Sequence, residues 1–157
     1  MSADEKRARE LSYRYLAIRP RSKAEVVRYL GGKGFTEDIV SAVILTLEGY
    51  GYLDDAKFAS GWARQLVGTK GLSRRAVGYE LRRKGISEIN ADAAVEGLSD
   101  DETGSDDEVA LRVARKKAES LAGLETEKAR RRLVSYLQRR GFSYGVISGA
   151  LRALNKE

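Results

Sequence analysis

The side chains of this sequence that are best equipped for chemistry are clustered arginines and lysines. Guanidinium groups bind carboxylates and phosphates through paired hydrogen bonds. The densest run is Arg130 to Arg132. Because successive residues of a helix point about 100° apart, this run must spread over a helix surface. A solvated face that only keeps the protein soluble is one interpretation. The other is a partner-binding surface, for which we predict the following residues: Arg74, Arg75, Arg82, Arg83, Lys84, Arg130, Arg131, Arg132, Arg139 and Arg140.

Catalytic and metal-binding residues are not indicated. The chain has no His and no Cys, which removes the commonest general base and the thiolate nucleophile. Asp54 and Asp55 form a carboxylate pair, but they precede an Ala-rich helical stretch, where helix capping explains them better. Lys33 lacks the spacing of a phosphate loop, and the acidic residues 99–106 lack that of a calcium loop. We therefore expect no enzyme, no cofactor and no metal.

The charge is distributed unevenly along the chain. The net charge is +6, yet the stretch between Gly85 and Leu111 has nine acidic residues and no Lys or Arg. A basic chain that contains one acidic segment suggests an acidic or polyanionic partner. The N-terminal residues contain no apolar core of a signal peptide, and no run reaches the about 18 apolar residues of a membrane helix. We expect a cytoplasmic monomer without membrane association.

A short motif that would end one helix and begin the next occurs three times, at 30–36, 81–87 and 137–143. Each copy has a leucine, two further residues, a basic residue, a glycine, a large apolar residue and then Ser or Thr. The basic residue suits the negative end of a helix, and the glycine can adopt the left-handed conformation that closes it. The Ser or Thr can cap the following helix. We call these motifs the corners.

The corners recur about every 50 residues, which is typical of a helical repeat. We therefore predict an all-α protein of three tandem three-helix repeats, with about nine helices in an elongated, curved molecule. The expected units are 1–51, 52–98 and 107–157, joined before the third unit by a flexible acidic linker at 99–106. The expected helix caps are Ser22 (with Glu25 in a capping box), Thr36, Asp54, Ser73, Ser87 and Ser143.

These corners and the helices beside them resemble the RecX family of recombinase regulators over nearly the whole chain. The most specific part is the stretch Gly51–Ala59, which reads Gly-Tyr-Leu-Asp-Asp-Ala-Lys-Phe-Ala. Leu72 stands where many relatives have Pro, so the start of the next helix is less rigidly set. The acidic linker is also more highly charged than the pattern requires. The other matching stretches are Leu16–Ser22 with Glu25 and Leu30, Gly71–Arg75, Glu80–Ile86 and Leu137–Ser143.

The resemblance implies a protein that binds the RecA recombinase, chiefly as a filament on single-stranded DNA. Members of the family lie along the helical groove of the filament. They suppress its ATP hydrolysis, strand exchange and co-protease activity, and so modulate recombination, DNA repair and the SOS response, without catalysis of their own. The alternative is a helical-repeat nucleic-acid-binding protein that contacts DNA phosphates directly. Weak binding to single- or double-stranded DNA is compatible with both.

Overall fold

The computed structural model describes all 157 residues and contains helices and connecting segments only. The first unit consists of α1 (Ala3–Ile18), α2 (Lys23–Gly32) and α3 (Glu37–Gly49). The second consists of α4 (Asp55–Gly68), α5 (Arg74–Arg83) and α6 (Glu88–Glu96), followed by the one-turn helix α7 (Asp100–Thr103). The third consists of α8 (Asp106–Ser120), α9 (Thr126–Arg139) and α10 (Tyr144–Asn155).

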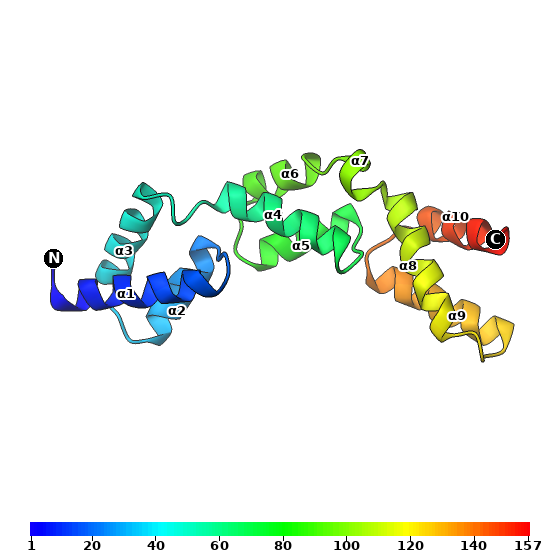
Figure 1. Ribbon diagram of the computed structural model, residues 1–157, viewed down its shortest axis with the longest axis horizontal. Helices are drawn as coiled ribbons and strands as arrows, with labels where there is room; N and C mark the ends of the chain where they lie inside the picture. The colour runs from blue at the N-terminus through cyan, green and yellow to red at the C-terminus, as the bar shows by residue number, and fades with distance from the viewer.

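The three units follow one another along the long axis of the molecule, and the two termini lie at opposite ends (Figure 1). The main helix–helix packing is within each unit, with α1 against α3, α4 against α6 and α8 against α10. The prediction of an all-helical, three-unit repeat is confirmed. None of the helices is both long and apolar enough to cross a bilayer.

The helices begin where side-chain oxygens can cap them. Ser22 and Glu25 form the expected capping box at the start of α2. The other expected caps also accept a backbone hydrogen bond from the first turn: Thr36, Asp54, Ser73, Ser87 and Ser143. Helix α9 is the exception, because its N-cap is Glu125, which makes no side-chain cap. Counted from the corner glycine, α9 also begins about one turn earlier than α2 and α5.

The corner glycines adopt the conformation that the sequence predicts. Gly34, Gly85 and Gly141 have φ angles of 90°, 88° and 90°, which only glycine adopts readily. The N–H of the residue after each glycine donates to the carbonyl of the corner leucine, which closes the helix as in a Schellman motif. These bonds are Phe35 to Leu30 (3.3 Å), Ile86 to Leu81 (3.1 Å) and Phe142 to Leu137 (3.3 Å).

The apolar interior is divided into two cores. The first unit has its own core of nine buried residues, which runs from Ala8 to Leu53 in the sequence. The second and third units share one core of 21 buried residues, from Phe58 to Leu151. The first unit is therefore joined to the rest of the molecule mainly by polar contacts, whereas the other two units form one continuous body.

Between the first two units, the corner of the second unit packs against the start of α2. The Ser22 hydroxyl donates to the Lys84 carbonyl over 3.2 Å, and the Lys84 ammonium lies 3.9 Å from the Glu25 carboxylate. The backbone approaches so closely at Gly85 that a Cβ atom there would lie 2.4 Å from the Cβ of Ala24. Glycine is thus required by packing as well as by its φ angle.

The corner of the third unit packs against the start of α5 in the same manner. The Ser73 N–H donates to the Arg140 carbonyl over 3.0 Å, and the Arg140 guanidinium donates to the Lys70 carbonyl. A Cβ atom at Gly141 would lie 2.5 Å from the Ser73 hydroxyl oxygen and 2.7 Å from the Cβ of Ala76. The second and third units therefore each present their corner to the unit that precedes them.

The acidic segment 99–106 is anchored, so the expectation of a flexible hinge was wrong. Arg74 of α5 lies 2.7 Å from the Asp100 carboxylate and 3.6 Å from that of Asp106. Its guanidinium also donates to the carbonyls of Gly104 and Leu98. Because Arg74 neutralises part of the acidic run, the segment can fold back onto the second unit and form α7.

Glu25 is expected to make the first junction sensitive to pH. Burial alone would raise the pKa of Glu25, but the Ser22 N–H, Arg19 and Lys84 outweigh it and hold the pKa below its ordinary value. Stability from the ionised group is therefore present above the ordinary pKa and is lost as the pH falls through the lower folded-state pKa. Glu25→Gln should lower the free energy of unfolding by roughly 1 kcal/mol near neutral pH.

Urea unfolding at about pH 7 and about pH 3 measures this effect, because carboxylates titrate between those values. The difference between the native protein and Glu25→Gln should be smaller at the lower pH. Glu119→Gln is the control, because Glu119 is exposed on α8 and has no ion-pair partner. A Glu25→Gln deficit that is equal at both pH values contradicts this role of the carboxylate.

Candidate partner-binding groove

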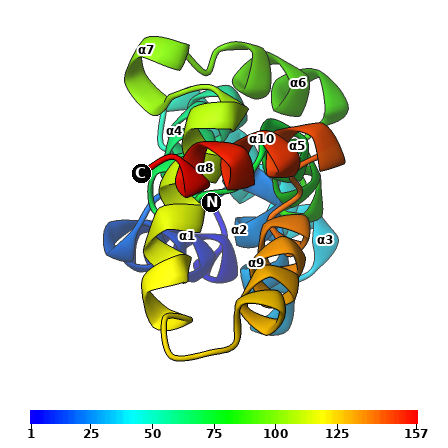
Figure 2. The ribbon, with the colours of Figure 1, turned by 90° about the vertical axis from the view of Figure 1, so that its right-hand side faces the viewer.

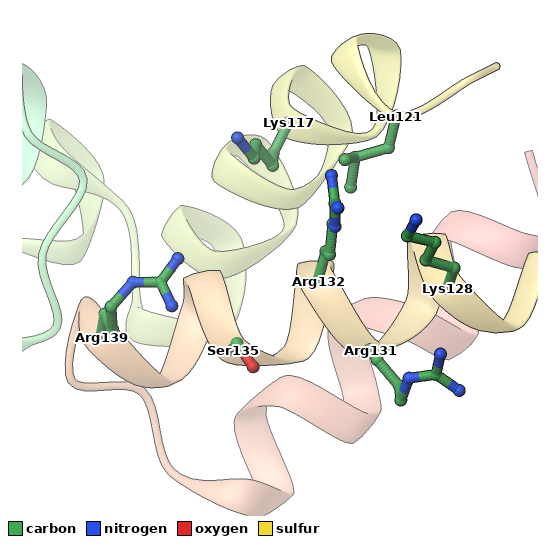
Figure 3. Close-up of a pocket in the computed structure, with 7 residues that line it drawn as sticks. All are labelled: Lys117, Leu121, Lys128, Arg131, Arg132, Ser135 and Arg139. Atoms are coloured by element: carbon green, nitrogen blue, oxygen red, sulfur yellow. The ribbon is translucent and has the colours of Figure 1, made fainter. Parts of the chain in front are cut away.

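A groove of about 610 Å³ lies between α8 and α9 in the third unit. Figure 3 shows the side chains around it, and Figure 2 shows the two helices side by side, joined by the loop at one end. Five of the seven lining residues are cations, none of them is acidic, and none has a carboxylate within 4.0 Å. The lining residues are Lys117, Leu121, Lys128, Arg131, Arg132, Ser135 and Arg139.

One face of α9 supplies most of this lining. Residues 128, 131, 132, 135 and 139 follow the three- and four-residue spacing of one helix side. Leu133 and Leu137 lie on the other side and are buried in the shared core. The apolar side thus fixes the rotation of α9, and this rotation directs the basic side towards the groove.

Helix α8 completes the groove from the opposite wall. Its Lys117 ammonium lies 4.7 Å from the centre of the Tyr136 ring, which holds this cation near α9. Arg132 points from α9 towards α8, whereas Arg131 points away from it (Figure 3). The groove therefore has positive charge on both walls and at its outer edge.

This arrangement is suited to binding and not to bond-making chemistry. Cations without an internal counter-ion retain their capacity to pair with carboxylates or phosphates. No group of three or more His, Cys, Asp or Glu side chains could hold a metal ion. The groove also offers no carboxylate, thiol or imidazole that could act as a base or nucleophile.

The sequence-predicted basic residues of the third unit are only partly brought together. Arg131, Arg132 and Arg139 line the groove, and the exposed Arg130 does not. Lys117 and Lys128 were missed. Lys128 could have been found, because it stands three residues before Arg131 on the same helix side. Lys117 had no signal in the sequence, because it belongs to another helix.

Three of the predicted residues make contacts with other units or segments of the molecule. Arg74 holds the acidic segment, Lys84 lies against Glu25, and Arg140 donates to the Lys70 carbonyl and the Tyr136 hydroxyl. The remaining predicted residues of the second unit are exposed at or near α5, where Arg83 lies 3.5 Å from Glu80. These are Arg75, Arg82 and Arg83.

Comparison with known proteins places all three units in one family. Protein-family models described as the first, second and third three-helix domains of RecX match residues 8–47, 54–95 and 105–151. The chain is 33% identical to "Regulatory protein RecX" of Amycolatopsis mediterranei (strain U-32), over 97% of this chain and 87% of that protein. It is 34% identical to the protein of the same name in Thermobifida fusca (strain YX), over 89% of this chain and 74% of that one.

The fold is shared with a solved structure of the same name. The crystal structure of RecX from Lactobacillus salivarius superimposes with a TM-score of 0.79 over the whole of both chains, at 22% sequence identity. The family models cover most of the sequence, and the two relatives match it over 87% and 74% of their own length. The chain therefore belongs to the RecX family of regulatory proteins.

Proposed function

We propose that this protein binds the RecA recombinase filament and inhibits its ATPase, strand-exchange and co-protease activities, thereby modulating recombination and DNA repair. The observation that carries the proposal is the unpaired positive groove of Arg131, Arg132 and Arg139 in a member of a family of regulatory proteins. The protein acts as a cytoplasmic monomer and has no catalytic activity of its own.

The shape of the molecule supports binding along a filament. Three units in a row present successive surfaces over an extended length, so one molecule can span more than one repeating subunit of a polymer (Figure 1). Such a bridge would oppose the subunit rearrangements that accompany ATP hydrolysis. The groove supplies charge-paired contacts at one end of this row, and exposed Arg75, Arg82 and Arg83 supply a second proposed contact surface.

The units that we propose to act as separate contact modules are 1–51, 52–98 and 107–157, with 99–106 as the connection.

The alternative function is a direct DNA-binding protein, because the unpaired cations of the groove could equally pair with phosphates. An excess of DNA distinguishes the two functions.

We expect this protein to inhibit the DNA-dependent ATPase of a RecA recombinase at substoichiometric ratios and to continue inhibiting when single-stranded DNA is in large excess. A filament-bound inhibitor is not removed by free DNA, whereas a DNA-binding competitor is. The measurement is steady-state ATP hydrolysis at increasing inhibitor concentration, with and without added oligothymidylate. The absence of any effect on the ATPase would rule out the proposed function. Inhibition that the added DNA abolishes would instead favour direct DNA binding.

A further inference from the structure

The groove between α8 and α9 has a counterpart in the first unit. Nine residues before the corner glycines Gly34 and Gly141 stand Glu25 in α2 and Arg132 in α9. Ala76 holds the same position in α5. Glu25 and Arg132 line equivalent hollows, each formed between the first and the second helix of its unit. The repeat therefore allows the three units to be compared position by position.

In the first unit, the unit that follows forms one wall of this hollow. The lining comes from Tyr15 of α1, from α2, and from the corner of the second unit: Tyr15, Glu25, Arg28, Tyr29, Arg83 and Lys84. The docked corner is held through its main chain, because Ser22 donates to the Lys84 carbonyl, and through its charge, because Lys84 lies near Glu25.

The second unit receives the corner of the third unit at the same place. The Arg140 carbonyl accepts from the Ser73 N–H, and the Arg140 guanidinium reaches the Lys70 carbonyl at the end of α4. In the first and second units, the start of the second helix is thus a docking site for the end of a helix, the basic residue after it and the corner glycine.

In the third unit, the same hollow is lined by residues at α8 and α9 and by no corner of another unit. The charge at the compared position is reversed, because Arg132 stands where the first unit has Glu25. The additional first turn of α9 brings Lys128 to its edge. All three corners of this chain carry a basic residue before the glycine, namely Lys33, Lys84 and Arg140. A second copy would therefore meet repulsion in this hollow, where an acidic segment would be attracted.

We propose that the α8–α9 groove is a vacant inter-unit docking site with reversed charge, which binds an acidic segment at a helix end of a partner protein. The inference rests on the proposed function, since it names the part of the partner that would enter the groove. A polypeptide is favoured over a nucleic acid because the equivalent docking sites at the starts of α2 and α5 bind main-chain carbonyls. Complementary charge supplies the selectivity for carboxylates.

A fluorescein-labelled hexaglutamate peptide tests the groove directly, with fluorescence anisotropy as the readout. Arg132→Glu should weaken peptide binding about tenfold or more, the effect of one lost and one repulsive charge contact. Lys116→Glu is the matched control, because Lys116 is exposed on α8 beside Lys117, does not line the groove and has no ion pair. It makes the same change in net charge and should weaken binding less than about twofold.

Several results would overturn the inference. Equal losses in the two variants would mean that only net charge attracts the peptide. Oligothymidylate that competes for the groove more strongly than the peptide would make a nucleic acid the occupant. Self-association of the native protein that Arg132→Glu abolishes would make a second copy the occupant. Circular dichroism before each measurement checks that the exposed substitutions leave the fold intact.

Inhibition of the recombinase ATPase distinguishes a failure of this inference from a failure of the proposed function. If the native protein inhibits and Arg132→Glu requires about ten times more protein for the same inhibition, both stand. If the two inhibit equally, the groove is not the docking site, although the proposed function stands. If neither inhibits, the proposed function is wrong, and the peptide measurement alone decides the groove.

Discussion

Replacing Gly141 by alanine is expected to lower the free energy of unfolding by about 3 kcal/mol, while the same substitution at Gly34 costs only about 1 kcal/mol. Both residues have a φ angle of 90°, so both substitutions introduce the same left-handed strain. Only at Gly141 would the added Cβ meet neighbouring atoms, at 2.5 Å from the Ser73 hydroxyl oxygen and 2.7 Å from the Cβ of Ala76. No atom lies within 4 Å of it at Gly34.

Urea unfolding monitored by far-ultraviolet circular dichroism measures both variants. The difference between them isolates the cost of separating the third unit from the second, because the backbone strain cancels. Gly85→Ala should resemble Gly141→Ala, since its Cβ would lie 2.4 Å from that of Ala24. Equal losses at Gly34 and Gly141 would show that the corner does not pack tightly on α5.

Truncating a corner leucine should destabilise different parts of the molecule, depending on the unit. Leu30 and Leu137 are both fully buried, and removing such a side chain costs about 2–5 kcal/mol. Leu30 belongs to the core of the first unit and Leu137 to the core that the other two units share. Leu30→Ala should therefore unfold the first unit alone, whereas Leu137→Ala should lower the stability of the second and third units together.

The single tryptophan separates these outcomes. Trp62 lies on α4 and packs against the shared core, so its fluorescence reports on the second and third units, while circular dichroism reports on all helices. In Leu30→Ala the dichroism transition should precede the fluorescence transition. In Leu137→Ala the fluorescence transition should shift to lower urea. Coincident transitions in Leu30→Ala would mean that the molecule unfolds as one cooperative unit.

The helix ends and corners could be predicted from the sequence because their interactions are local. Ser22 caps the helix that begins at the next residue, and Gly85 closes the helix that ends just before it. These hydrogen bonds join residues three to five positions apart, so the types and the order of the residues are sufficient. The threefold recurrence of this local signal then predicted the number of units.

The groove and the junctions could not be predicted in the same way. Arg74 and Arg140 looked like partner contacts, because nothing in the sequence shows that Asp100 and the Lys70 carbonyl lie within their reach. Lys117 joins the groove only through the packing of α8 against α9. Such contacts depend on the angles between helices and between units, which the buried side chains set collectively. The acidic linker was expected to be flexible for the same reason, because the arginine that neutralises part of its charge lies on α5.

The division of the interior into two cores makes the molecule unevenly stiff. Bending between the second and third units would separate apolar side chains where their shared core crosses the junction, and exposing apolar surface costs about 25 cal/mol for each Å². Bending at the first junction mainly rearranges contacts such as that of Lys84 with Glu25, which water can replace. We therefore expect the molecule to bend more readily between the first and second units than between the second and third. When it adapts to a curved partner, most of the deformation should fall on that joint, and the α8–α9 groove should keep its shape.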